Sequence, residues 1–285
     1  MENELKVAIQ GVRGAFHEVA AREFFQDRPL AIVEKMTFGD LLDSVVDGSS
    51  DYGIIAIENT IAGTIHANLK LLRQKRVRIC GEVSIRIRQD LVVLPGTKIE
   101  DLREVRSHYM AINQSRDFFQ QYPQIRLVEC DDTALAIQQV RQENNPTIGA
   151  IGGEMAARLY GLEVLVPGIE TNKKNYTRFL IVKREDLPGL DAYNKASLSI
   201  VLPSHMGSLS QILSIIAFYG IDLTKIESLP IIGEPLNYMF YIDIRFESME
   251  RYHNMLTAIR PLLKELDVLG EYMADECSWK RIHDQ

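Results

Sequence analysis

Apolar residues recur along the chain with two different spacings, which predict strands and helices. Apolar positions at helical spacing predict helices at Phe16–Phe25 and Phe38–Val46, and short apolar runs around them predict strands. This alternation continues to about residue 184 and favours a parallel or mixed sheet with helices on its faces. The other elements predicted here are strands over 5–9, 30–34, 52–57, 83–93, 105–107, 126–129, 147–151 and 179–182, and helices over 64–74, 111–121, 133–142 and 154–159.

A charged segment separates this region from a second one. Lys183–Gly189 is charged and ends in a Pro-Gly dipeptide, which predicts a linker. We therefore expect domains at 1–184 and 196–285, joined by a linker at 185–195. The second region is predicted to have the order β-α-β-β-α-β, the split βαβ plan of ferredoxin-like domains. That plan hosts many functions and identifies none of them. Its predicted strands are 196–202, 222–228, 238–246 and 266–273, and its helices are 209–218 and 249–263.

The composition is that of a soluble globular protein. Of 285 residues, 46% are hydrophobic and 25% are charged. The net charge of −7 argues against a nucleic acid partner, because phosphate binding requires a basic face, but it does not exclude a small anionic ligand. The N-terminal residues lack the basic start and apolar stretch of a signal peptide, and no apolar run is long enough to span a bilayer. We expect a cytoplasmic protein with no membrane partner.

The cysteines do not indicate a cross-linked or metal-binding framework. Cys80, Cys130 and Cys277 are widely spaced and odd in number. No pair of them has metal-ligand spacing, so the sequence predicts reduced thiols and no metal site.

Polar clusters follow several of the predicted strands. In open α/β sheets, ligands bind beyond the carboxyl ends of the strands. The clusters can converge there only if two sheets face each other around a cleft. They are Gln10–Gly14, Glu58–Thr64, Ser107–Gln114 and Asp131–Thr133.

The first cluster has a structural and a functional interpretation. Gly11 and Gly14, at a strand-to-helix junction, suit a tight turn or an anion at a helix N-terminus. A third glycine is missing for a dinucleotide fingerprint, and no Gly-Lys-Ser/Thr follows for a phosphate loop. A structural turn is therefore favoured, and His17 at the helix start is expected to be a surface capping residue.

The next clusters leave similar alternatives open. Asn59, Thr60 or Thr64 could cap the following helix or belong to a site with Glu58. Ser107 is adjacent to a histidine, but neighbouring strand residues point to opposite faces, so a helix cap or ligand donor is favoured over a nucleophile.

The segment Asn175–Phe179 combines an amide, a hydroxyl and a fixed cation within five residues. Arginine can hold a carboxylate through two hydrogen bonds. A surface strand start and a binding site are equally compatible with this segment taken alone.

In this order, the clusters resemble the prephenate dehydratase family across nearly the whole chain. The family's glycine-proline-x-glycine turn is similar to Gly11–His17, and its Glu-Asn-Ser segment is similar to Ala56–Gly63. Its Ser-His-Pro-Gln segment is similar to Ser107–Gln114, and its Ser-Thr-Ala segment to Asp132–Ala134. The Asn-x-Thr-Arg-Phe signature matches Asn175–Phe179 without a change and is the most specific match. Departures from the family pattern occur at Val12, Ala15, His17, Thr60, Tyr109 and Met110.

The second region resembles the ACT regulatory domain fused to these enzymes. The Gly-Ala-Leu turn of the ACT domain is similar to Gly207–Leu209 of this chain. The Leu-Thr-x-Ile-Glu-Ser-Arg-Pro segment of the ACT domain is similar to Leu223–Pro230. In the family these segments form a phenylalanine-binding, feedback-inhibiting surface at a dimer interface. Asp222 replaces the asparagine that the family usually has, which adds a negative charge to the control site. Leu229 replaces the family's arginine, which removes a positive charge. The regulatory residues implied are Gly207, Ser208, Leu209, Asp222, Glu227 and Ser228.

The resemblance implies a fold and an assembly. The first domain would be a two-lobed, periplasmic-binding-protein-like catalytic domain with mixed sheets around a cleft, followed by a ferredoxin-like βαββαβ ACT domain. A homodimer or homotetramer inhibited by L-phenylalanine is expected. No helical chorismate mutase segment precedes residue 5, so a monofunctional enzyme is expected.

The resemblance also implies a reaction. Prephenate would lose CO₂ and water to give phenylpyruvate in phenylalanine biosynthesis, and because the ring receives the electrons, neither metal nor organic cofactor is needed. Thr177 would donate a hydrogen bond to the leaving hydroxyl, because it is too weak an acid to protonate it fully. Glu58 would be a general acid if burial raised its pKa. Arg178 would neutralise the substrate by direct contact or order the strand. The catalytic residues implied are Thr177, Glu58 and Asn59, and the substrate-binding residues are Thr60, Thr64, Ser107, Gln114, Thr133, Asn175, Arg178 and Phe179.

Two alternatives remain at this point. An arogenate dehydratase would act on the related substrate in which an amine replaces the keto group. A non-catalytic amino-acid-binding sensor would also combine a cleft with an ACT domain, although the intact Thr177–Phe179 and Glu58-Asn59 segments argue against it.

Overall fold

The computed structural model describes residues 4–231, 233 and 238–276, so Cys277 and the last part of the predicted second domain lie outside the described residues. The chain forms two compact units, Met1–Ile65 with Val83–Phe179 and His66–Glu82 with Leu180–Gln285. Strands β5 (Val77–Arg86) and β11 (Tyr176–Arg184) each contribute residues to both units. The domain division at 184–196 stays a prediction. No helix in the described ranges is long and apolar enough to cross a membrane.

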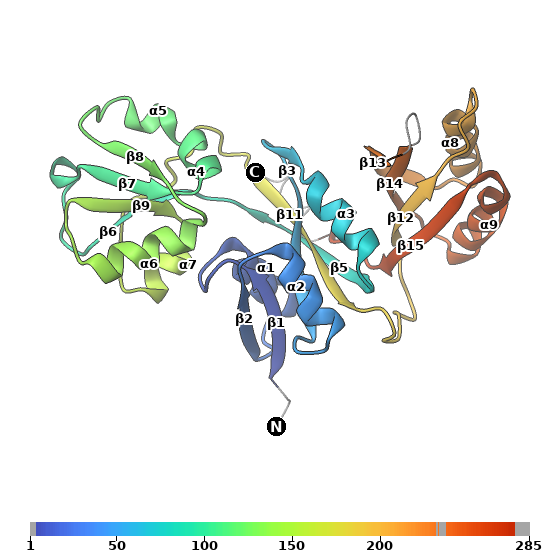
Figure 1. Ribbon diagram of the computed structural model, residues 1–285, viewed down its shortest axis with the longest axis horizontal. Helices are drawn as coiled ribbons and strands as arrows, with labels where there is room; N and C mark the ends of the chain where they lie inside the picture. Colours follow the sequence, from blue (N-terminus) through green and yellow to red (C-terminus); the bar gives the residue numbers. More distant parts are fainter. Residues whose placement is uncertain (1–3, 232, 234–237, 277–285) are drawn as a thin grey trace. The chain divides into compact units, whose positions relative to one another are not determined.

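The first unit begins with a small parallel sheet (Figure 1). Its elements are β1 (Leu5–Gln10), α1 (Phe16–Phe25), β2 (Leu30–Lys35), α2 (Phe38–Val46), β3 (Tyr52–Asn59) and β4 (Gly63–Thr64). Strand β1 pairs in parallel with β2 on one side and β3 on the other, and β4 pairs antiparallel with the end of β3. Val7, Ala8 and Ile9 are fully buried, as expected for a central strand covered by helices.

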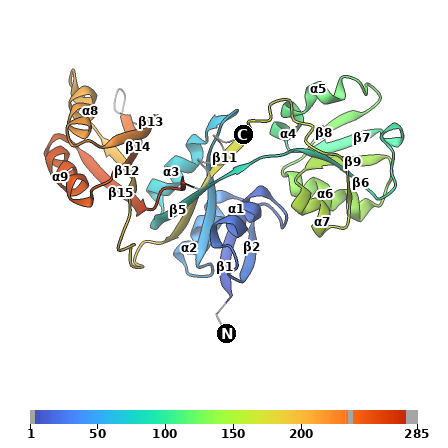
Figure 2. The same cartoon turned by 180° about the vertical axis from the view of Figure 1, so that it is seen from behind.

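A second, five-stranded sheet completes the first unit. Its elements are β6 (Asp90–Val93), β7 (Glu104–Ser107), α4 (Tyr109–Gln114), α5 (Arg116–Phe119), β8 (Arg126–Glu129), α6 (Thr133–Glu143), β9 (Ile148–Gly152), α7 (Glu154–Leu159) and β10 (Glu163–Val166). The strand order is β10-β6-β9-β7-β8. Helices α4 and α5 cover one face, and α6 and α7 cover the other (Figures 1 and 2). Strand β6 supplies both faces, because Leu91 and Val93 pack in one cluster and Val92 in the other.

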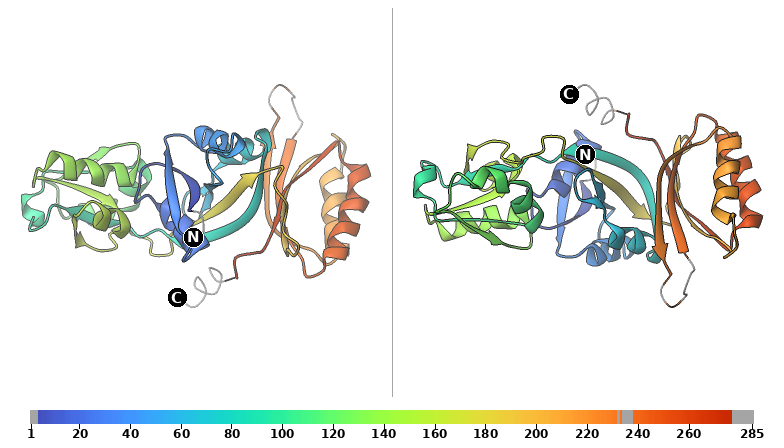
Figure 3. Two further views of the ribbon diagram at one scale, coloured as in Figure 1. Left: turned by 90° about the horizontal axis from the view of Figure 1, so that it is seen from below. Right: turned by 90° about the horizontal axis from the view of Figure 1, so that it is seen from above.

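The second unit is a mainly antiparallel sheet with helices α8 (Ser208–Phe218) and α9 (Met249–Ile259) on one face (Figure 3). Its elements are α3 (His66–Gln74), part of β5, β12 (Lys195–Val201), α8 (Ser208–Phe218), β13 (Asp222–Pro230), β14 (Tyr238–Arg245), α9 (Met249–Ile259) and β15 (Glu265–Tyr272). The strand order β13-β14-β12-β15 and the β-α-β-β-α-β sequence are those of a ferredoxin-like domain. Helices α8 and α9 pack on the sheet through Ile212, Ile216, Tyr252 and Met255. The predicted α/β fold class with mixed sheets and a ferredoxin-like second region is confirmed, whereas the assignment of that region as an ACT domain stays a prediction.

Several predicted elements are wrong in detail. The strand predicted over 83–93 is two strands, because the chain leaves one sheet after Arg86 and enters the other at Asp90. The helix predicted over 111–121 is interrupted at Ser115, whose φ and ψ of −111° and 5° are not helical. The helix predicted from residue 64 begins at His66, because Gly63 and Thr64 pair with β3 instead. Strands β4 and β10 were not predicted.

Candidate active site

A cavity of about 440 Å³ lies within the first unit, where loops and strand ends of its two sheets meet. Both sheets contribute side chains, so the polar clusters converge as the sequence predicts. The lining residues are Gln10, Phe16, His17, Phe38, Ala56, Asn59, Ala62, Ile65, Ile87, Gln89, His108, Met110, Ala111, Gln114, Asp131, Asp132, Thr133, Thr177 and Phe179.

Asn59, at the end of β3, is the centre of a hydrogen-bond network beside this cavity. Its Oδ1 accepts the backbone N–H groups of Ile61 and Ala62, both at 2.9 Å, so its amide nitrogen must point the other way. That nitrogen donates to Asn175 Oδ1 at 2.7 Å and to Thr177 Oγ1 at 2.9 Å. The segments Glu58-Asn59 and Asn175–Phe179, which the sequence marked as candidate site segments, therefore contact each other through side-chain hydrogen bonds.

Thr177 is oriented by this network as a hydrogen-bond donor. Its side chain lines the cavity, and its Oγ1 already accepts a hydrogen bond from Asn59. No acceptor for its own O–H contacts it within the described part of the chain, so the hydroxyl hydrogen can be donated to a ligand. Asn175 donates to Gln114 Oε1 at 2.8 Å, which leaves the amide nitrogen of Gln114 available at the cavity wall.

Arg178 and Glu58 do not line the cavity. Side chains alternate along β11, so Thr177 and Phe179 share one face and Arg178 points to the other. There its Nη1 lies 3.2 Å from Glu58 Oε1, and the two side chains are 10% and 33% exposed. Of the two roles predicted for Arg178, ordering the strand fits this geometry and direct contact with a ligand in the cavity does not; both roles stay predictions.

Three further predicted residues have structural contacts. Thr60 donates to Lys174 O and accepts from Tyr176 N, which fastens the end of β3 to the start of β11. Thr64 pairs with Glu58 in the short β3–β4 ladder. Buried Ser107 donates to Ile151 O at 2.6 Å. None of the three lines the cavity, whereas Thr133 and Phe179 do.

The prediction that Ser107 caps the following helix is wrong. The cap is its neighbour His108, whose Nδ1 accepts the Met110 N–H at 3.3 Å. Capping of the next helix by Asn59 is likewise not observed, since its side-chain oxygen accepts from the turn at Ile61 and Ala62.

The glycine turn after β1 is required by close packing. Gly11 and Gly14 have φ values of 95° and 88°, which side chains other than glycine rarely adopt. A Cβ on Gly14 would lie 2.7 Å from the Cα of Ala156, and one on Gly11 would lie 2.8 Å from Asp132 Oδ2. The structural interpretation of this turn is confirmed, and the turn brings α1 against the elements that carry Asp132 and Ala156.

His17 is not the surface residue expected from the sequence. It lines the cavity, with its ring 5.0 Å from that of Phe179 and 5.4 Å from that of Phe38. Burial lowers its pKa to about 3. The imidazole is therefore neutral at physiological pH, which excludes it as a proton donor there. The aromatic and imidazole rings form an uncharged wall suited to a six-membered carbon ring.

Asp132 begins helix α6. Its Oδ1 accepts the N–H groups of Ala134 and Leu135, both at 2.9 Å, which is the geometry of an N-cap. Burial raises the pKa of this carboxyl group. It lines the cavity beside Asp131, which is exposed.

Sequence reasoning did not propose site roles for several lining residues: Gln10, His17, Gln89, His108, Asp131 and Asp132. Most of them lie inside the polar clusters that the sequence marked, so cluster membership was the available signal. Gln89 had no such signal, because it lies inside the strand predicted over 83–93 and outside the marked clusters.

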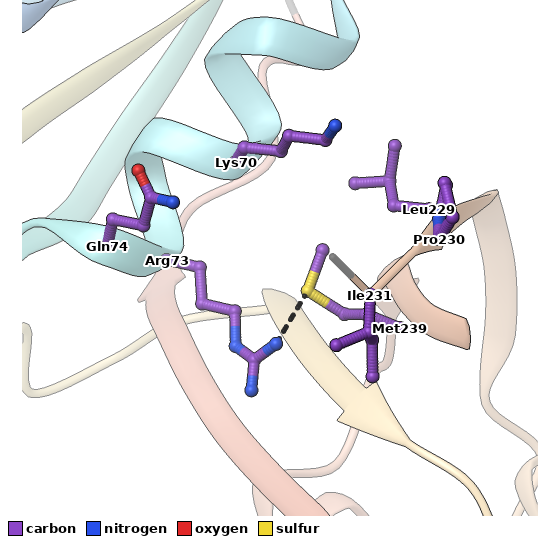
Figure 4. A pocket seen from close by; sticks show the side chains of 7 residues that line it. All are labelled: Lys70, Arg73, Gln74, Leu229, Pro230, Ile231 and Met239. Atoms are coloured by element: carbon purple, nitrogen blue, oxygen red, sulfur yellow. Dashed lines mark hydrogen bonds between the residues drawn. The ribbon is translucent and has the colours of Figure 1, made fainter. Parts of the chain in front are cut away.

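Two cavities in the second unit bear on the predicted control site. One of about 420 Å³ is lined by Gly207, Ser208 and Leu209, together with exposed Met206, but not by Asp222, Glu227 or Ser228. Another of about 320 Å³ lies between α3 and the β13–β14 pair, and it is lined by Leu229 but by none of the six implied regulatory residues (Figure 4). There Arg73 donates to Met239 Sδ at 3.2 Å.

A concave cavity with aromatic walls and a few oriented polar groups is typical of an enzyme that acts on a small molecule. The family model described as prephenate dehydratase matches residues 7–187. The chain therefore belongs to the prephenate dehydratase family, which confirms the resemblance found in the sequence.

Individual relatives agree with this family. The chain is 35% identical to "Arogenate dehydratase 2" of Petunia hybrida, covering 96% of this chain and 73% of that protein. It is 30% identical to "Bifunctional chorismate mutase/prephenate dehydratase" of Escherichia coli strain K12, covering 95% and 71%.

Two solved structures are similar over nearly their full length. The structure of Arthrobacter aurescens prephenate dehydratase in complex with L-Phe has a TM-score of 0.84 and 26% identity, covering 96% of this chain and 91% of that one. A structure described as "GqqA- a novel type of quorum quenching acylases" has a TM-score of 0.85 and 27% identity, covering 95% and 99%.

Proposed function

We propose that the protein converts prephenate to phenylpyruvate, CO₂ and water. The ring carboxylate leaves as CO₂, its bonding electrons enter the ring, and the hydroxyl on the opposite ring carbon departs and takes up one proton to become water. Aromatisation provides the driving force, so no cofactor or metal is needed. The orientation of Thr177 carries this proposal: its oxygen accepts from Asn59, and its hydrogen is free to stabilise the departing hydroxyl.

The other side chains have supporting roles in this proposal. Asn59 fixes the Thr177 hydroxyl, and Asn175 fixes Gln114, whose amide nitrogen can donate to a substrate oxygen. Phe179 and its ring neighbours pack against the substrate ring. Thr60 and Arg178 hold β3 and β11 in register.

A direct assay tests the proposal. Purified full-length protein is incubated with prephenate and, separately, with arogenate, each with and without L-phenylalanine, and the products are separated by chromatography. Phenylpyruvate formation from prephenate is expected. No product from either substrate would contradict the proposal and support a non-catalytic amino-acid sensor.

Arogenate dehydratase is the second candidate function. Within the described residues, the cavity lining contains two aspartates and neither lysine nor arginine. Prephenate carries two negative charges, whereas the ammonium group of arogenate offsets one of them. The charge of the cavity therefore favours arogenate, and the Petunia hybrida relative carries that name.

Glu58→Gln should have a small effect on turnover. Glu58 lies beside Arg178 and outside the cavity lining, so its loss removes one partly exposed ion pair, worth about 0–1 kcal/mol. We expect kcat to fall by less than about tenfold with an unshifted pH profile, whereas losing a general acid typically costs about 10²–10⁴-fold. Steady-state measurement of kcat across a range of pH, for the unmodified protein and for Glu58→Gln, tests this prediction. A loss of the larger size, together with disappearance of a titration step, would establish Glu58 as the acid.

We also propose that L-phenylalanine controls the enzyme through the second unit. The supporting observations are the Gly207–Leu209 cavity and the L-Phe complex of the Arthrobacter aurescens protein. Glu227, on β13, contacts His66 at 3.2 Å and Lys225 at 3.3 Å, so this predicted control residue is connected to α3. An ACT-type second domain, a homodimer or homotetramer and a cytoplasmic location belong to the same proposal. Inhibition of product formation by L-phenylalanine in the assay above is the expected result.

A further inference from the structure

Asp132 departs from the family pattern at a position that borders the cavity. The resemblance aligns it with the serine of the family's Ser-Thr-Ala segment. Only one of its carboxylate oxygens has the capping role, since Oδ1 accepts both helix N–H groups. Oδ2 lies on the side of the Gly11 turn, within 2.8 Å of where a Cβ on Gly11 would be. An acidic side chain therefore stands at the position where the resemblance gives the family a serine.

The surroundings of Asp132 do not offset its charge with a fixed cation. The lining contains no lysine or arginine within the described ranges, and His17 is neutral. His108 is the remaining lining residue that can become positive, and its Nδ1 accepts the Met110 N–H. The capped N–H groups of α6 are no longer free to bind a ligand carboxylate.

We propose that Asp132 is a specificity-determining residue that favours a substrate side chain bearing an ammonium group over one bearing a keto group. This inference rests on the proposed function, since prephenate and arogenate differ at that group alone. A carboxylate attracts the ammonium of arogenate and offers no hydrogen-bond donor to the keto oxygen of prephenate. Asp132 also repels the carboxylate of the substrate side chain, but this repulsion is the same for both substrates. It therefore does not change the ratio of their kcat/KM values.

The chain offers a matched test, because Asn and Ser cap helices about as well as Asp. Asp132→Asn and Asp132→Ser remove the charge and keep the cap. The measured quantity is the ratio of kcat/KM for arogenate to kcat/KM for prephenate. We expect both variants to lower this ratio about tenfold relative to the unmodified protein, which corresponds to about 1.4 kcal/mol. Asp27→Asn is the control, because Asp27 is exposed and lies outside the cavity lining, so the same ratio should change by less than about threefold.

The outcomes separate the two proposals. If the unmodified protein forms no phenylpyruvate from prephenate, the proposed function fails. If it converts either substrate but the ratio is unchanged in Asp132→Asn, the role of Asp132 is overturned. A parallel fall in both rates would indicate a structural role and also overturn it, as would an equal change in Asp27→Asn. Unchanged thermal unfolding of the variants confirms that α6 remains capped.

Discussion

Thr177→Ala is expected to lower kcat by about 10²–10³-fold, the usual cost of removing one oriented donor to a group that develops charge in the transition state. The structure gives the reason: the Thr177 hydroxyl lines the cavity, accepts from Asn59 at 2.9 Å and keeps its hydrogen for the substrate. KM should change much less, because the interaction strengthens as the hydroxyl leaves. Steady-state kinetics with prephenate and arogenate measure both constants.

Two further variants make this prediction specific. Thr177→Ser keeps the hydroxyl and should retain most of the turnover. Asn59→Ala should lower kcat as well, and the double variant should lose less than the sum of the two single losses, because both changes remove the Asn59–Thr177 hydrogen bond. Near-normal turnover of Thr177→Ala would refute the donor role, and additive losses in the double variant would refute the role of Asn59 in orienting Thr177.

Lys195→Met is expected to lower the free energy of unfolding by about 3–5 kcal/mol, the usual cost of removing one partner of a buried ion pair. Lys195 Nζ lies 2.8 Å from both carboxylate oxygens of Glu82, and the two side chains are 9% and 5% exposed. The Asp275 N–H also donates to Glu82 Oε1 at 3.1 Å, but it cannot replace the ammonium charge. Urea unfolding followed by circular dichroism measures the loss.

An exposed ion pair of the same unit provides the control. Arg184 lies 2.5 Å from Asp186, with side chains 42% and 66% exposed. Arg184→Met should therefore change stability by less than about 1 kcal/mol. Combining Lys195→Met with Glu82→Gln should recover much of the loss, because no unpaired charge remains. A loss under about 1 kcal/mol in Lys195→Met would show that Glu82 finds another partner or is hydrated.

The sequence by itself determined the elements and their order. Apolar periodicity located most strands and helices of both units within a few residues, because burial of one face imposes a period of 2 or 3.6 on the chain. It failed at Ile87–Gln89, where two strands follow each other with only three residues between them and the chain crosses from one sheet to the other. The segments Glu58-Asn59 and Asn175–Phe179 could also be marked in advance, because amides, hydroxyls and charges in strand-end clusters are recognisable as residue types.

Only the tertiary structure decided which of these side chains face one cavity. Asn59 and Asn175 are 116 residues apart, and their contact depends on the placement of β3 beside β11. Alternation along β11 then separates Thr177 from Arg178, although nothing in the sequence says which face is the cavity. His17 and Asp132 become wall residues through packing around the Gly11–Gly14 turn. Periodicity and residue type are local properties of the chain, whereas the convergence of side chains depends on long-range packing, which one sequence does not reveal.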